Sequence, residues 1–449
     1  MNNIDRFREA LKIPTFWPAG TPAGDKTAEA VLQRFQEFLA ESYPAFHKAA
    51  ERWVLSPYSV VYRWPGESTA DAAKNSDRLP VLFLAHYDVV GAETGKWSVD
   101  PFGAEIRDGF IYGRGSLDMK NILIGIMEAA ETLCAGGFKP RRDIWFAFGG
   151  DEERTGVLGA VETVKWFTQR GQRFEWLIDE GTPIGDNLIK GINPPLALIS
   201  IDEKGYLSLE LSVTQEPGHS SMPPKTQAAA VLGKALDRIG NRLFPFSLSP
   251  AVESFFKHLA PLMPGIKEFV MLHARSLGPL FYKIAGANPT IAAMLRTTMA
   301  MTQLEGSSAE NVLPSKVRAI LNLRLIPPWT VETAMDFVKK AVNDERVNVK
   351  VHSMSGDPVS AKQGLQHSGW KQIEAVVTEL WPGVPVLPFV MVATTDSRHY
   401  FELAEGIYRF SPYKINQKDL SGIHGHDERI SEENLLKGIQ FYTRLMETS

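Results

Sequence analysis

The stretch VLFLAHYDVV, residues 81–90, decides how the chain can fold. Its first five residues form a short apolar run, which predicts a buried strand; the run ends at His86, with Asp88 two positions later. Further along, Asp118 follows the glycine-rich turn of GRGSLDMKN, residues 113–121, and precedes a helical pattern. Open α/β sheets bind their ligands where strands meet helices. The two stretches therefore predict an α/β sheet with a polar site at its edge.

Three further segments end in acidic or imidazole side chains. They are DIWFAFGGDEE (143–153), FEWLIDEG (174–181) and IHGHDERI (423–430). Consecutive acids beside a buried strand are costly unless they are solvated or bind a cation. Each cluster alone is also typical of a solvated loop, but together they indicate a metal site built from strand and loop ends.

These motifs, in this order, resemble the zinc-dependent aminoacylase and carboxypeptidase metallohydrolases, a family that includes acetylornithine deacetylase and succinyl-diaminopimelate desuccinylase. The segments that carry the resemblance are LAHYDVV (84–90), WSVDPFGAEIRDGFIYGRGSLDMKN (97–121), FGGDEERTG (148–156), IDEG (178–181), GHSSMPP (218–224), TTDSRHY (394–400) and IHGHDERI (423–430). The last three are most similar to the carboxypeptidase S and N-acyl-amino-acid hydrolase branch. The resemblance covers nearly the whole chain, from about residue 5 to 445.

Composition limits the class of protein. The 449 residues fit two or three domains. A hydrophobic content of 44% and a charged content of 22% are typical of a soluble globular protein. The formal net charge of −4 argues against nucleic acid as a partner. The N-terminus lacks a signal-peptide pattern and no apolar run is long enough to span a membrane, so we expect a cytoplasmic protein without a membrane partner.

The single Cys134 excludes an intrachain disulfide framework. It lies in the apolar pattern of a helix, so the sequence predicts a core position and not a nucleophile.

The order of the patterns predicts two kinds of domain. From residue 81 to 203 strands and helices alternate, which is typical of a mixed, mostly parallel sheet flanked by helices. Leu207 to Val213 and Val317 to Leu325 then alternate apolar and polar residues, as strands buried on one face do. Each of these strands is followed by a helical pattern, which predicts a small α+β domain. The resemblance implies that this domain is a ferredoxin-like lid inserted into the catalytic domain.

The predicted domains are residues 1–205 and 358–449 for the catalytic domain and 206–357 for the lid, with a helical insertion at about 246–300. Helices are also predicted at 157–170 and 396–403. The insertion could pack on the lid, shield the cleft or contact a second subunit.

The resemblance implies two zinc ions, with cobalt as a substitute. One would be held by His86 and Asp179 and the other by Glu153 and His424, with Asp118 bridging both. A mixture of imidazole and carboxylate ligands without cysteine suits catalytic zinc.

Two further acids have predicted roles beside the metals. Asp88 would accept the second N–H of His86 and so fix its tautomer. Glu152 would act as general acid and base, since the attacking water must lose a proton and the leaving amine must gain one. Only the resemblance decides that Glu153, and not Glu152, binds metal.

IHGHDERI offers two histidines for the same role. The family pattern places the ligand four residues before a glutamate, and Glu428 therefore selects His424 over His426.

The resemblance also implies substrate contacts. His219 would stabilise the developing oxyanion, in dimeric relatives from the partner subunit, so a homodimer through the lid stays open. Asn311 and Arg324 would bind the substrate carboxylate. Thr394 and Thr395 lie in a pocket-lining loop that departs from the Gly-Gly-Thr form of the wider family, which leaves the size of the pocket open.

The predicted function is hydrolysis of an amide bond next to a free carboxylate, in N-acyl-amino acids or at the C-terminus of short peptides. An aminopeptidase acting on di- or tripeptides is the alternative among enzymes. A binding protein without catalysis is the alternative from another class, but no expected ligand is missing.

Overall fold

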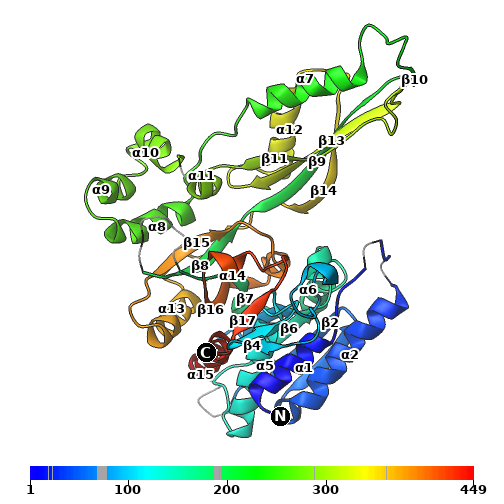
Figure 1. Cartoon of the computed structure of the whole chain (residues 1–449). Helices are drawn as coiled ribbons and strands as arrows, with labels where there is room; N and C mark the ends of the chain where they lie inside the picture. Colours follow the sequence, from blue (N-terminus) through cyan, green and yellow to red (C-terminus); the bar gives the residue numbers. More distant parts are fainter. Residues whose placement is uncertain are drawn as a thin grey trace. The chain divides into compact units, whose positions relative to one another are not determined.

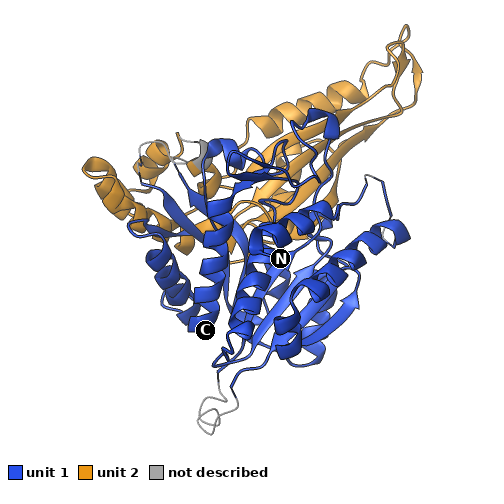
Figure 2. Ribbon diagram, turned by 60° about the horizontal axis from the view of Figure 1, so that its bottom comes forward, with its two compact units in different colours: residues 1–201, 361–388, 395–449 blue, residues 202–360, 389–394 orange. Residues whose placement is uncertain are grey.

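The computed structural model describes residues 1–18, 20–22, 24–67, 78–186, 192, 194–287, 289–360 and 362–449. The chain forms two compact units (Figure 2): Met1–Ile201, Ala361–Pro388 and Thr395–Ser449 make unit 1, and Asp202–Ser360 with Phe389–Thr394 make unit 2. The units thus divide near residues 201 and 361, where the sequence predicted 205 and 358. The short piece 389–394 joins unit 2, which no sequence pattern indicated.

An eight-stranded sheet, most of which lies in unit 1, has the order β1-β2-β6-β3-β7-β16-β8-β15 (Figure 1). Its strands are β1 (Glu51–Ser56), β2 (Ser59–Trp64), β3 (Val81–His86), β6 (Ile144–Gly149), β7 (Phe174–Gly185), β8 (Leu196–Glu203), β15 (Val386–Met391) and β16 (Ala404–Ile415). The central neighbours β6–β3, β3–β7 and β7–β16 pair in parallel, whereas β1–β2, β2–β6 and β16–β8 are antiparallel. The predicted mixed α/β sheet is therefore confirmed.

Helices cover both faces of this sheet, which explains why β3 and β6 are buried along their whole length. Alternate residues of a strand point to opposite faces. Leu82 and Leu84 pack in one cluster with Phe167 of α6, while Phe83 packs against Tyr442 of α15. The helices of unit 1 are α1 (Asn3–Lys12), α2 (Lys26–Ser42), α3 (Pro44–Ala49), α5 (Lys120–Ala135), α6 (Ala160–Gln169), α13 (Ser368–Leu380), α14 (Gln417–Leu420) and α15 (Glu432–Thr448).

The helix predicted at 396–403 is wrong in type: the structure has a short 3-10 helix, η4 (Asp396–Tyr400). The helix predicted at 157–170 begins later, at Ala160, because Gly156 (φ 66°) and the turn after it precede α6. None of the helices in the described part of the chain combines the length and the hydropathy that a bilayer span requires.

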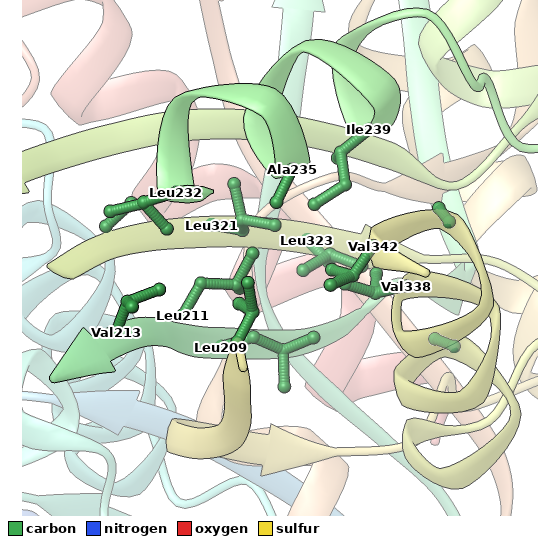
Figure 3. Packing of buried hydrophobic residues seen from close by; sticks show 14 of the residues in the cluster. Leu209, Leu211, Val213, Leu232, Ala235, Ile239, Leu321, Leu323, Val338 and Val342 are labelled. Atoms are coloured by element: carbon green, nitrogen blue, oxygen red, sulfur yellow. The ribbon is translucent and has the colours of Figure 1, made fainter. Parts of the chain in front are cut away.

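Unit 2 is built on a four-stranded antiparallel sheet of order β11-β13-β9-β14. Its elements are β9 (Gly205–Thr214), α7 (Ala228–Gly240), β11 (Thr298–Glu305), β13 (Lys316–Leu325), α12 (Val331–Val342) and β14 (Asn348–Gly356). The chain therefore runs strand–helix–strand twice, as predicted. Figure 3 shows the core, in which Leu209 and Leu211 of β9 and Leu321 of β13 lie beneath α7 and α12.

Between α7 and β11 lie α8 (Pro250–Leu259), α9 (Ile266–Leu272), α10 (Gly278–Ala285) and α11 (Pro289–Leu295). The helical stretch predicted at 246–300 overlaps the start of β11, because the apolar residues of that strand continue the helical pattern before it.

A small sheet of order β17-β5-β4 completes unit 1: β17 (Arg429–Ser431), β5 (Phe110–Tyr112) and β4 (Ile106–Arg107). It brings the chain after His424 beside the chain before Asp118.

Candidate metal centre

His86 ends β3 and is almost fully buried, at 1% exposure. Its Nδ1 lies 3.0 Å from the backbone carbonyl of Asp88, an acceptor, so the ring carries its proton on Nδ1 and presents the lone pair of Nε2. The sequence assigned this role to the Asp88 carboxylate, which lies further away, at 3.4 Å. The carboxylate instead accepts the backbone N–H groups of Glu152 (3.2 Å) and Glu153 (3.1 Å). Asp88 thus orients both the imidazole and the acidic loop.

Asp118 faces two histidines at once. Its Oδ1 lies 3.1 Å from Nε2 of His86, and its Oδ2 lies 3.0 Å from Nε2 of His424. In the metal-free protein burial raises the pKa of Asp118, but hydrogen bonds from His424 and His86 in their protonated forms outweigh it and hold that pKa below its usual value. Asp118 therefore belongs to two groups of candidate metal ligands, one that contains His86 and one that contains His424.

The group of candidate ligands that contains His424 is completed by Asp118 and Glu153. Oε1 of Glu153 lies 3.2 Å from Nε2 of His424. His424 has a left-handed backbone (φ 57°), which side chains other than glycine rarely adopt and which is common at functional sites. Hydrogen bonds to Asp118 and then Glu153 raise the pKa of His424 to about 10 in the metal-free protein.

The group of candidate ligands that contains His86 is completed by Asp118 and Glu180. Oε1 of Glu180 lies 3.5 Å from Nε2 of His86. The predicted ligand Asp179 is its neighbour on β7, and successive strand residues point in opposite directions. Both Asp179 oxygens accept backbone hydrogen bonds, from Glu180 and Ser397 at 2.9 Å each. The geometry therefore favours Glu180 over Asp179 as the third ligand.

This choice can be tested by metal affinity. Glu180→Gln should weaken binding of one metal by at least about 100-fold, since it removes the negative charge of a ligand and leaves only a neutral amide oxygen. Asp179→Asn should cost about tenfold, the lower end for a group that supports ligands. Competition with a chelator, monitored for each variant, measures both values; the reverse order of effects would restore Asp179 as the ligand.

Both groups fit a divalent cation. In each group the ligand atoms lie within 4.8 Å of one another, and the donors are imidazole nitrogen and carboxylate oxygen, the set that suits catalytic zinc. Burial, and next the charge of Asp118, raise the pKa of Glu180 to about 8 and shift that of Glu153 upward. Buried carboxylates in such number are stable in their ionised form only with added positive charge. A bound cation would supply that charge.

Glu152 belongs to neither group of ligands found among the described residues. Its Oε2 lies 4.0 Å from Nε2 of His86. Burial raises its pKa well above the usual value. An acid beside the ligands but outside their shell is placed to exchange protons.

Unit 2 carries the predicted His219 and Asn311, and it brings them together. The two-residue strands β10 (Gly218–His219) and β12 (Val312–Leu313) pair, and the backbone N–H of Ser220 donates to the carbonyl of Asn311 at 3.1 Å. The His219 ring is exposed, and its Nδ1 accepts the backbone N–H of Ser221 at 3.2 Å. The neutral ring therefore carries its proton on Nε2 and can donate it outward.

The other predicted substrate residues lie in different surroundings. The Arg324 guanidinium stacks 4.8 Å above the ring of Tyr206 within unit 2. Thr394 is half-buried at the end of the 389–394 piece of unit 2. Thr395 is buried in unit 1, and its hydroxyl is 2.6 Å from that of Ser397, which holds Asp179. In this structure Thr395 therefore contacts the segment that holds Asp179.

Sequence reasoning missed three contributors. Besides Glu180, these are Ser397, through its backbone N–H, and Glu428, which served only to locate His424. Asp151 accepts the N–H groups of Leu158 and Gly159 and so closes the loop behind Glu152. The adjacent acids in IDEG could have pointed to Glu180. Ser397 and Glu428 act through backbone hydrogen bonds, which leave no signal in the sequence.

Comparison with known protein families gives a match over most of the chain. The profile of peptidase family M20/M25/M40 matches residues 82–448. The chain belongs to this family. Its membership confirms the predicted resemblance, identifies the chain as a metallohydrolase and implies a divalent metal, usually zinc.

Curated relatives of this M20 chain match along nearly all of it. N-fatty-acyl-amino acid synthase/hydrolase PM20D1 of Xenopus tropicalis is 34% identical and covers 99% of this chain and 85% of its own. Probable carboxypeptidase S-like 2 of Dictyostelium discoideum is 33% identical, covering 100% and 86%.

Solved structures confirm the M20 fold. The M20 family metallo-carboxypeptidase Sso-CP2 from Sulfolobus solfataricus has a TM-score of 0.74 at 16% identity, over 100% of this chain and 99% of its own. Human carnosine dipeptidase 1 has a TM-score of 0.70 at 16% identity, over 99% and 95%.

Proposed function

We propose that this M20 enzyme uses two zinc ions to hydrolyse an amide bond next to a free carboxylate, in N-acyl-amino acids or at the C-terminus of short peptides. The observation that carries the proposal is the position of Asp118, whose two oxygens each face a histidine of a different ligand group. The names of the relatives support the substrate class, since both N-fatty-acyl-amino acids and carboxypeptidase substrates join an amide to an amino acid with a free carboxylate.

In this proposal each metal ion has two ligands of its own, and the two ions share a third. His86 and Glu180 would hold the first ion, and Glu153 and His424 the second, with Asp118 between them. When bound, a pair of zinc ions lowers the pKa of a water molecule and polarises the scissile carbonyl. The Asp88 carbonyl, which accepts the Nδ1 proton of His86, would leave the lone pair of Nε2 available to that first ion.

Glu152 would handle the protons. As a carboxylate it takes one proton from the attacking water, and as the acid so formed it delivers that proton to the leaving amine. Its raised pKa in the metal-free protein reflects burial; nearby cations would lower that pKa and favour the carboxylate form needed for the first step.

The groups of unit 2 would bind the substrate. Arg324 offers a planar fork that matches a carboxylate, and its stacking on Tyr206 limits its freedom. His219 lies in β10 and Asn311 directly precedes β12, the strand paired with β10; the two side chains would meet the carbonyl and the carboxylate. Thr394 would border the pocket for the amino-acid side chain.

A substrate panel tests the proposal. Protein freed of metal and reloaded with zinc should bind two ions per chain and hydrolyse N-acyl-amino acids and N-blocked dipeptides. The same compounds with the C-terminal carboxylate amidated should react at least about 100-fold more slowly, because they lose a charge-assisted bidentate contact of roughly 3 kcal/mol.

Two results would contradict the proposal. Faster hydrolysis of dipeptides with a free amino group than of their N-acylated forms would indicate an aminopeptidase. Full activity in protein that contains no divalent ion would exclude the metal mechanism.

A further inference from the structure

Glu428 is fully buried, at 0% exposure, and within the described part of the chain its carboxylate is hydrogen-bonded to a single loop. Its two carboxylate oxygens accept four donors from residues 114–118. The donors are Leu117 N (2.7 Å) and Asp118 N (3.1 Å) to Oε1, and Gly115 N (3.2 Å) and Arg114 Nη1 (2.6 Å) to Oε2. This is the loop that presents Asp118.

The same loop is fastened to the segment that presents His424. Arg114 donates its Nη2 to the carbonyl of Gly425 at 2.8 Å, and the backbone N–H of Gly113 donates to the carbonyl of Glu428 at 2.9 Å. The Arg114 guanidinium also lies 5.3 Å above the ring of Trp97. Asp118 and His424 are thereby joined through a short, buried chain of hydrogen bonds.

These hydrogen bonds are needed to hold Asp118 and His424 in place, because neither residue lies in a strand or a helix. The loop that precedes Asp118 turns at Gly115, which has φ +89°, and His424 is itself in a left-handed conformation. Loops have more conformational freedom than the elements they connect. A shared ligand contacts two groups correctly only if it is held to within about 0.5 Å.

We infer that Glu428 is a positioning residue, which fixes the shared ligand Asp118 relative to His424 and so sets the geometry of both metal sites. The inference rests on the proposed two-metal function. It requires a carboxylate and not merely a side chain of this size. All four partners are donors, so a glutamine would turn its amide N–H groups toward other N–H groups.

A matched control lies in the same unit. Glu128 is equally buried and also binds an arginine, Arg6, through contacts of 2.5 Å to each carboxylate oxygen, with Tyr43 at 3.1 Å. It lies on α5, eight residues beyond Lys120 and thus about 12 Å along the helix axis. Glu128→Gln therefore imposes a comparable loss of buried charge away from the metal ligands.

The test compares wild type, Glu428→Gln and Glu128→Gln with zinc and cobalt. Glu428→Gln should weaken metal binding by about 10–100-fold in chelator competition, change the visible absorption spectrum of the cobalt form, and lower kcat more than it raises KM. Glu128→Gln should lower thermal stability but leave metal affinity and the cobalt spectrum as in wild type.

Arg114→Lys serves if Glu428→Gln does not fold. It keeps the positive charge but loses the planar fork whose two nitrogens bond Glu428 and Gly425. Its metal affinity and cobalt spectrum should therefore change in the same direction, more weakly. Wild-type affinity and spectrum in Glu428→Gln or, where that variant is unfolded, in Arg114→Lys would overturn the inference. A wild-type protein that itself binds no zinc would instead defeat the proposed function.

Discussion

Glu152→Gln should keep both metals and lose about 10²–10⁴-fold or more in kcat, the usual cost of removing a general acid–base group. Glutamine has the same size but cannot accept and return a proton. Glu152 belongs to neither ligand group among the described residues, so its loss leaves the donor atoms in place. Metal analysis and single-turnover kinetics of the zinc-loaded variant measure the two effects separately.

Glu153→Gln is the control, because the two glutamates are neighbours on one 3-10 turn and both donate their backbone N–H to the Asp88 carboxylate. Glu153→Gln should weaken metal binding, since Oε1 of Glu153 lies 3.2 Å from Nε2 of His424. If Glu152→Gln emptied a metal site and Glu153→Gln did not, the two roles would be exchanged.

The pH dependence gives a second readout. A general base acts when ionised, so kcat/KM should rise with pH through the pKa of Glu152 and then level off. Burial raises the pKa of Glu152 in the metal-free protein, and bound metal lowers it again. The rise should therefore lie at a lower pH than the pKa of Glu152 in the metal-free protein. Glu152→Gln should lose this limb, and a profile that kept it would assign it to another group.

Much of the fold could be predicted because buried parallel strands have a simple pattern. Every residue of β3 and of β6 is buried, so β6 and the first five residues of β3 appear as unbroken apolar runs. β16 has no such pattern, although it lies near the centre of the sheet: it contains Arg409, which is buried, and Pro412. Its burial follows from its neighbours in space and not from its own composition.

The candidate centre could be predicted only to the level of the segments. Strand ends, a glycine-rich turn and short acidic or histidine-containing runs located the segments that hold His86, Asp118, Glu152 and His424. Within their segments, Glu152 and His424 were chosen from the family resemblance. The choice between Asp179 and Glu180 depends on which face of β7 meets His86, and strand register sets that. Glu428 carries no chemical signal, since its partners are mainly backbone N–H groups of a loop more than 300 positions away.

His219→Ala should lower kcat by about 10²–10³-fold, the typical cost of losing one oxyanion donor, with zinc content and thermal stability as in wild type. The Ser221 N–H fixes the His219 proton on Nε2, so the exposed edge of the ring is a donor. Ser221→Ala is the matched control: it removes the hydroxyl 2.8 Å from Nδ1 but keeps this backbone N–H. It should therefore retain most of the activity.

The experiment also decides which subunit provides the donor. His219 belongs to unit 2, and the metal ligands belong to unit 1. If a partner subunit lends His219, mixing inactive His219→Ala with inactive Glu152→Gln should restore some activity, because a hybrid dimer contains one centre with both groups intact. No restoration, with a monomer by light scattering, would assign His219 to the centre of its own chain. Near-normal kcat in His219→Ala alone would remove it from the mechanism, because a group that donates to the developing charge contributes to the transition state and must appear in kcat.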